Sequence, residues 1–110
     1  MAEYLFVYGS LRAGNENRFA RMVQARCVGM GDGFVRARVF RLACYRALKE
    51  AVGPQDRVWG EVYRFKPGAR LLPVLDRYEG RRFKRRLTRV ELANGRVVEA
   101  WCYWGLKGQA

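Results

Sequence analysis

Apolar residues at the start of the chain follow first the period of a strand and then the period of a helix. A compact run of β-branched and aromatic residues, Tyr4–Tyr8, ends at a glycine and predicts a buried first strand. Farther along, Phe19, Met22 and Val23 recur at the spacing of one helical face. The chain therefore opens with a core strand and a short amphipathic helix, joined by a loop.

The middle of the chain predicts strands interrupted by glycine and proline. The glycine-rich stretch 28–33 lacks the spacing of a phosphate-binding loop, so a bulged or bent strand explains it better. Apolar residues within Val35–Val39 alternate with arginines, which indicates a half-buried strand with a basic outer face. Residues 43–55 predict a loop with a short strand or turn, and residues 58–65 predict a strand with two distinct faces.

The last third of the chain predicts a helix followed by a hairpin. Leucines within residues 71–78 have helical spacing, and Gly80 is a natural stop for that helix. Asn94-Gly95 lies between two strand-like runs, 83–92 and 96–104, which predicts a β-hairpin. The apolar residues of the first run change face part-way along it, so we expect a bulge near its start.

Together these elements predict an α+β fold in a single domain spanning residues 1–110. Five to six strands form a curled or barrel-like sheet, because such a sheet leaves few edges exposed, and two short helices accompany it. Half of the residues are hydrophobic, which is enough for a core without disulfides or a structural metal.

The amino-acid composition limits the kinds of catalytic and metal site that the chain can form. The sequence has no histidine, which excludes histidine-dependent triads and zinc sites that need imidazole. The cysteines Cys27, Cys44 and Cys102 are odd in number and far apart, so we expect reduced, buried thiols and neither a disulfide framework nor a metal site. Met1–Tyr8 matches neither a signal peptide nor a membrane span, so we expect a soluble, cytoplasmic protein without a membrane partner.

The net charge of the chain is compatible with several kinds of binding partner. The chain has 22 Lys and Arg against 10 Asp and Glu, a formal net charge of +12. Such a field attracts nucleic acid, anionic membrane surfaces or acidic small molecules. The densest cluster runs from Arg81 to Arg89, but charge runs are usually solvated faces, so the charge alone does not assign a function.

Two segments carry residues suited to ligand chemistry. Val7–Arg12 leads a core strand into a turn at Gly9, where the missing Cβ lets a ligand approach and successive N–H groups can hold an anion. An ordinary strand-ending turn is the alternative. Leu75–Gly80 puts Asp76 and Glu79 three residues apart, on one helical face, although two solvated acids at a helix end have the same spacing.

Five segments in order resemble the gamma-glutamylcyclotransferase superfamily, including its AIG2-like members. They are Tyr8–Arg12, Gly60–Tyr63, Leu75–Gly80, Phe83–Arg85 and Ala100–Tyr103. Each is weak alone, but their order and spacing agree over nearly the whole chain. Two departures stand out. A phenylalanine begins the fourth segment where tyrosine is commoner. Residues 43–55, where we expect leaving-group specificity, read Tyr45-Arg46-Ala47-Leu48 and lack the frequent Tyr-Pro pair.

The resemblance implies a mixed β-barrel with peripheral helices and a pocket at the end of the first strand. It implies an enzyme that converts a γ-glutamyl amine or peptide to 5-oxoproline and a free amine, with Glu79 as general acid and base and no metal, nucleotide or other cofactor. It also implies a set of substrate-binding residues: Tyr8, Gly9, Ser10, Leu11, Arg85 and Tyr103. A useful Glu79 needs its pKa raised by burial, against the pull of nearby arginines.

Two other functions remain open at this point. The same fold serves equally well as a non-catalytic ligand-binding or regulatory domain, because a fold does not fix an activity. Nucleic-acid binding through Arg81–Arg89 is the least favoured, because the usual RNA-binding signatures are absent. The sequence leaves the oligomeric state and the leaving amine undetermined.

Overall fold

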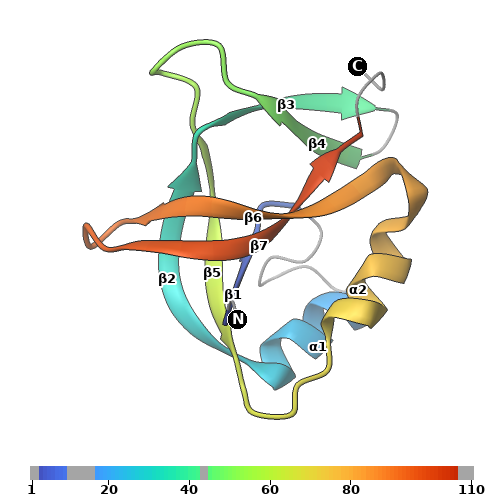
Figure 1. The fold of residues 1–110 in the computed structure, drawn as a ribbon. Coiled ribbons are helices and arrows are strands. Elements are labelled where there is room, and N and C mark those ends of the chain that lie inside the picture. The colour runs from blue at the N-terminus through green and yellow to red at the C-terminus, as the bar shows by residue number, and fades with distance from the viewer. Residues whose placement is uncertain (1–2, 10–16, 43–44, 107–110) are drawn as a thin grey trace.

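The computed structural model describes residues 3–9, 17–42 and 45–106, without the side chains of Leu42 and Tyr45. One α-helix follows the first strand, and the other lies between the fifth and sixth strands, as Figure 1 shows. A short 3₁₀ turn, Gly80–Arg82, follows the second helix. The elements are β1 (Tyr4–Val7), α1 (Arg18–Arg26), β2 (Cys27–Val35), β3 (Ala37–Leu42), β4 (Tyr45–Glu50), β5 (Val58–Phe65), α2 (Leu72–Glu79), β6 (Phe83–Leu92) and β7 (Val97–Gly105).

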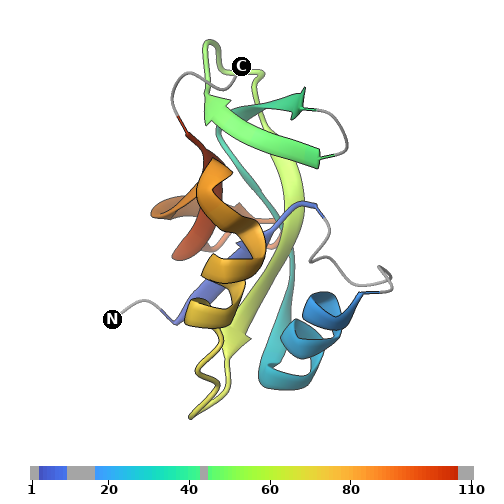
Figure 2. The ribbon, with the colours of Figure 1, turned by 90° about the vertical axis from the view of Figure 1, so that its right-hand side faces the viewer.

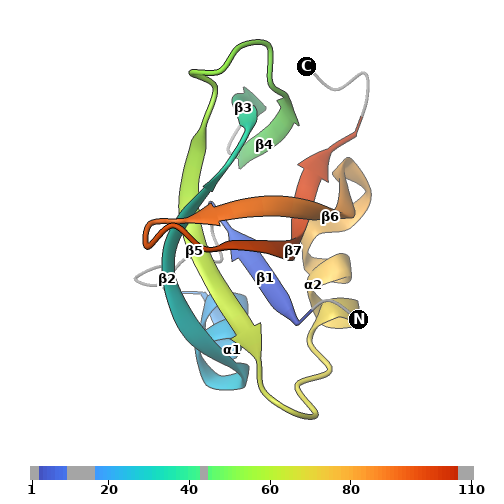
Figure 3. The same ribbon diagram turned by 60° about the vertical axis from the view of Figure 1, so that its left-hand side comes forward.

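Five of the strands close into a barrel in the order β1-β5-β2-β6-β7. Neighbouring strands are antiparallel except at the seam, where β7 returns parallel to β1, so the barrel is mixed. The predicted α+β barrel is confirmed. The strands β3 and β4 form a separate two-stranded sheet, which lies across one end of the barrel in Figures 1 and 3.

The first strand is buried on both of its faces. Phe6 points into a core cluster shared by the barrel and the β3–β4 hairpin, whereas Leu5 and Val7 face a second cluster that includes residues of α1 and α2. Figure 2 shows the two helices together on that side of the barrel. Burial on both faces explains why β1 is continuously apolar and does not alternate.

Glycines shape two of the barrel strands. The pairing of β2 with β5 shifts between Gly29 and Gly31, which is the bulge that the glycine-rich sequence predicts. On β5, a Cβ at Gly60 would collide with the carbonyl oxygen of Val7 and the ring of Phe6. Only glycine therefore lets β5 approach β1 this closely.

One expectation from the sequence is corrected. The bulge expected near the start of β6 is wrong, because β6 and β7 pair without any register shift from Phe83↔Gly105 to Glu91↔Val97. The irregular pattern arises because Leu87 is simply exposed. The short strand expected within residues 43–55 is β4, which pairs with β3 along its length.

The second helix ends as predicted. Gly80 has a φ of 78°, and its backbone N–H donates to the carbonyl oxygen of Asp76. This left-handed residue turns the chain sharply after Glu79 and toward β6. Among the residues that the structure describes, neither helix has the length or the apolar character needed to cross a membrane.

Candidate active site

The end of β1, the last turn of α2 and the strand β7 meet through two tyrosines. The Tyr8 hydroxyl donates to the backbone carbonyl oxygen of Tyr103 at 2.7 Å. The Tyr103 hydroxyl in turn donates to Oδ1 of Asp76 at 2.6 Å. Tyr103 therefore connects the first strand to the second helix, although these two elements are far apart in the sequence.

Asp76 also holds Arg85 from the neighbouring strand. Nη1 of Arg85 lies 3.4 Å from Oδ2 of Asp76, and the guanidinium lies over the Trp101 ring at 4.8 Å from its centre. The carboxylate balances the arginine's charge, and the indole ring supports the guanidinium plane. These contacts fix α2 against the β6–β7 hairpin one helical turn before Glu79.

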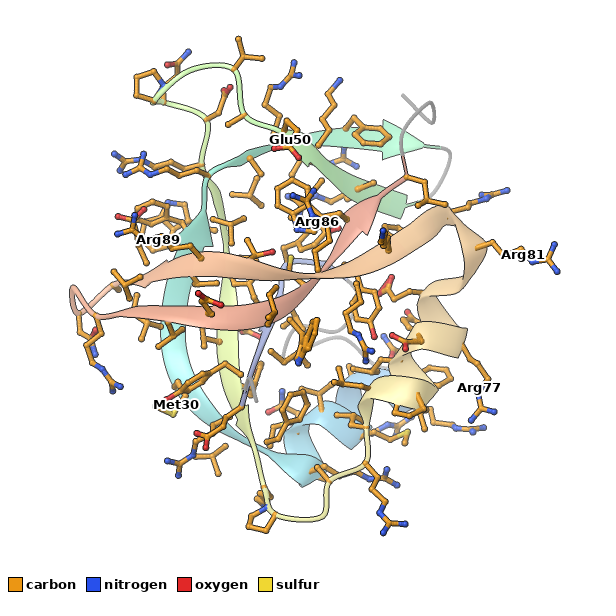
Figure 4. The ribbon with its side chains drawn as sticks, in the orientation of Figure 1. Met30, Glu50, Arg77, Arg81, Arg86 and Arg89 are labelled. Carbon is orange, nitrogen blue, oxygen red and sulfur yellow. The ribbon has the colours of Figure 1, made fainter. Side chains whose placement is uncertain are left out.

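Glu79 is half-buried at the end of α2. Burial raises the pKa of its carboxyl from 4.5 to about 7. Of the arginines expected to oppose this rise, Arg81 projects outward beyond the helix end in Figure 4, and Arg85 is paired with Asp76. A carboxyl with a pKa near neutrality is suited to both accepting and donating a proton.

The negative charge of Glu79 affects the pKa values of three surrounding groups. Burial chiefly, and the negative charge of Glu79 in addition, raise the pKa values of the Tyr8 hydroxyl, the Cys102 thiol and the Tyr103 hydroxyl. Glu79 is the last residue of α2, which packs in one core cluster with residues of β1 and β7. Both Tyr8 and Glu79, which the sequence predicts as one site, are thus brought together.

Arg46 of β4 also reaches this region. Its Nη1 donates to the backbone carbonyl oxygen of Tyr8 at 3.0 Å, and its charge lowers the pKa of the Tyr8 hydroxyl, against the larger effect of burial. The sequence analysis expects leaving-group specificity from residues 43–55, which include Arg46, but assigns no contact to Arg46 itself. The sequence does not specify that the β3–β4 hairpin folds back onto the end of β1, so the contact of Arg46 with Tyr8 is seen only in the tertiary structure.

Comparison with known proteins identifies the family. A family model described as "Gamma-glutamyl cyclotransferase, AIG2-like" matches residues 5–109. The chain belongs to this family. The match spans every strand and helix described above apart from the first residue of β1.

Relatives agree with this assignment. A Methanocaldococcus jannaschii protein named "Putative gamma-glutamylcyclotransferase MJ1514" is 29% identical over 105 residues, which are 93% of this chain and 83% of that protein. An AIG2-like protein of Mus musculus superposes with a TM-score of 0.71 at 20% identity, covering 93% of this chain and 76% of the mouse chain. YkqA of Bacillus subtilis gives 0.72 at 22% identity over 96% of this chain, but this chain spans only 36% of YkqA.

The residues that the family resemblance implies for the site fall into two groups. Tyr8, Glu79, Tyr103 and Arg85 lie within one network of contacts and charges. Gly9 follows Tyr8 directly, and a Cβ there would meet no atom of the described residues within 4 Å, so the space beside it is open. Ser10 and Leu11 lie outside the described residues.

The residues of this AIG2-like chain that the structure describes contain no cluster of three potential metal ligands. Cys27 and Cys102 are buried free thiols, and Cys44 is outside the described part of the chain. Among the described residues, the Glu79 and Asp76 carboxyls and the hydroxyls of Tyr8 and Tyr103 are ionisable groups of this site.

Proposed function

We propose that the protein is a cyclotransferase that converts a γ-glutamyl amine or γ-glutamyl peptide to 5-oxoproline and a free amine. The α-amino nitrogen of the substrate attacks its own γ-carbonyl carbon, a ring C–N bond forms, and the bond to the leaving amine breaks. Glu79 takes a proton from the attacking ammonium group and returns a proton to the leaving nitrogen, so no net proton is exchanged and no cofactor takes part.

The observation that carries this proposal is the half-buried carboxyl of Glu79 beside the end of β1. Because burial raises its pKa to about 7, both the protonated and the ionised forms of this carboxyl are populated near neutral pH. Membership of the AIG2-like family supports the reaction class. A site that holds both the attacking amine and the carbonyl gains further rate from proximity, because the attack is intramolecular.

The remaining residues are proposed to bind and orient the substrate. The turn that begins with Tyr8 and Gly9, and continues through Ser10 and Leu11, holds the glutamyl part through its backbone groups. Tyr103 and Arg85 contact the substrate from β7 and β6. Asp76 holds both side chains through the contacts at 2.6 and 3.4 Å, which fixes their positions near Glu79.

The direct test is incubation of the protein with a panel of γ-glutamyl amines and dipeptides, with 5-oxoproline as the readout. We expect Glu79→Gln to lower kcat by roughly 10²- to 10⁴-fold while ligand affinity is kept. Glu99→Gln is the matched control, because it makes the same chemical change at an exposed position of β7. Binding without product in the unaltered protein would instead assign the non-catalytic, ligand-binding function.

The pH dependence gives a second readout. Because Glu79 must be ionised to accept the first proton, kcat/KM should rise with pH through about 7, the value to which burial raises its pKa. A profile that stays flat between pH 6 and 8 would remove Glu79 from the role of base.

A further inference from the structure

The inner face of the β3–β4 hairpin changes from apolar to cationic at its tip. Ala37 and Val39 of β3 and Leu48 of β4 belong to or pack against the barrel core cluster. Side chains alternate along a strand, so Arg41 and Arg46 fall on this same face. They are also direct cross-strand partners in the antiparallel pair. This face of the β3–β4 hairpin therefore packs against the barrel core at its base and carries two adjacent arginines at its tip.

The two arginines have no acidic side-chain partner among the described residues. Like charges directly opposite each other destabilise an antiparallel pair. None of the ion pairs between described residues includes Arg41 or Arg46. Arg46 is half-buried, whereas Arg41 is exposed. A half-buried guanidinium without an acidic partner among the described residues is suited to binding an anion.

Arg46 is held beside the proposed site. One Nη1 atom donates to the carbonyl oxygen of Tyr8 at 3.0 Å, directly before Gly9. A guanidinium has five N–H donors in a planar fork, so this contact fixes the group and still leaves a second edge for a ligand. The charges of Arg46 and Glu79 both act on the Tyr8 hydroxyl, from the hairpin and from α2 respectively. Figures 1 and 2 show the hairpin above the end of β1.

We propose that Arg46, with Arg41 beside it, forms a carboxylate subsite that selects substrates whose leaving amine carries a carboxylate. The inference rests on the proposed cyclotransferase function. In that function the turn after β1 holds the glutamyl part and Glu79 serves the reacting amide. The arginine on the hairpin is then available to the part of the substrate beyond the amide. The substrate class is γ-glutamyl amino acids and peptides, in preference to γ-glutamyl derivatives of neutral amines.

A matched pair of substrates isolates this subsite. γ-Glutamylalanine and γ-glutamylethylamine differ only in the carboxylate of the leaving amine. We expect the unaltered protein to prefer the dipeptide in kcat/KM by about 10- to 100-fold, the worth of a charge-assisted hydrogen-bond pair. Arg46→Met should reduce this ratio by at least about tenfold. Arg96→Met is the control, because it removes the same charge from an exposed position at the β6–β7 turn and should leave the ratio unchanged.

The outcomes distinguish a failure of the proposed subsite from a failure of the proposed cyclotransferase activity. If Arg46→Met lowers turnover of both substrates equally, or of neither, the subsite is wrong. If the unaltered protein turns over neither substrate, the cyclotransferase function fails, and calorimetric titration then decides the subsite. Tighter binding of γ-glutamylalanine than of γ-glutamylethylamine, lost in Arg46→Met, supports it, and equal binding overturns it. Circular dichroism and Tm of each variant identify any loss of folding.

Discussion

Glu79 makes the stability of the protein depend on pH. Its pKa is about 7 in the folded protein against an ordinary 4.5. Between these values the unfolded chain has lost the proton that the folded protein still holds, so the folded state binds more protons. The free energy of unfolding attributable to Glu79 must therefore fall as pH rises from about 4.5 to about 7, and then level off.

Replacing Glu79 with glutamine should remove this dependence. A pKa raised from 4.5 to about 7 corresponds to roughly 3 kcal/mol, which solvent around the half-buried carboxyl reduces to about 1–2 kcal/mol. Urea unfolding at pH 5 and pH 8 measures the loss. We expect the unaltered protein to lose that much more than Glu79→Gln, and Glu99→Gln to behave like the unaltered protein. Parallel losses in all three would show that the carboxyl is not buried.

Tyr103 provides a second test at this scale. Tyr103→Phe removes the hydrogen bond to Asp76 but keeps the ring, so the carboxylate is left with Arg85 alone. A hydrogen bond to a charged group contributes roughly 1.5–3 kcal/mol, and we expect a loss of that size in the free energy of unfolding. Tyr4→Phe, a half-buried tyrosine on β1, is the control. Equal effects of the two variants would contradict the bridging role of Tyr103.

Among the elements, β1 and β5 depend on Gly60. In Gly60→Ala the new methyl group meets the Val7 carbonyl oxygen and the Phe6 ring, so the two strands must separate. Overpacking of this kind costs about 1–3 kcal/mol, which denaturant unfolding measures. Gly29→Ala is a suitable control, because its Cβ would meet only the Tyr63 ring, at an ordinary 3.8 Å. A Gly60→Ala protein as stable as that control would mean that β1 and β5 can move apart freely.

Elements marked by a local signal were predictable from the sequence. The apolar run of β1, the Asn-Gly turn between β6 and β7 and the glycine stop of α2 each have a short-range physical cause, and each is confirmed. The pairing of β3 with β4 was not predictable, because nothing local specifies which strand β4 joins. The bulge expected in β6 was wrong for a related reason: exposure of Leu87 is decided by the tertiary fold and not by its sequence neighbours.

The same distinction applies to the site. Tyr8, Gly9, Glu79 and Tyr103 were predicted because they lie in recognisable segments of an AIG2-like sequence. Arg46 lies in a segment without such a pattern and reaches the site only through the fold of the hairpin. Residues that contact the most variable part of a substrate are expected to lie in segments of this kind.

At the scale of the whole molecule, the net charge of +12 should assist capture of anionic substrates. γ-Glutamylalanine carries a net charge of −1 near neutral pH, whereas γ-glutamylethylamine is a neutral zwitterion. Raising the salt from about 20 to about 300 mM shortens the screening length, so we expect kcat/KM to fall several-fold for the first and little for the second. Steady-state kinetics over that range measures the effect. Equal salt dependence for both substrates would rule out long-range attraction.

The seam between β1 and β7 has a consequence for how the chain folds during synthesis. Tyr4 pairs with Ala100 and Leu5 with Trp101, so the strand that leaves the ribosome early receives its last neighbour only when the final hairpin emerges. Closing contacts between such distant segments is slow. Until then β1 has an open edge, which can recruit a strand from another nascent chain. Refolding from denaturant should accordingly lose yield as protein concentration increases, even where the closed barrel itself is fully soluble.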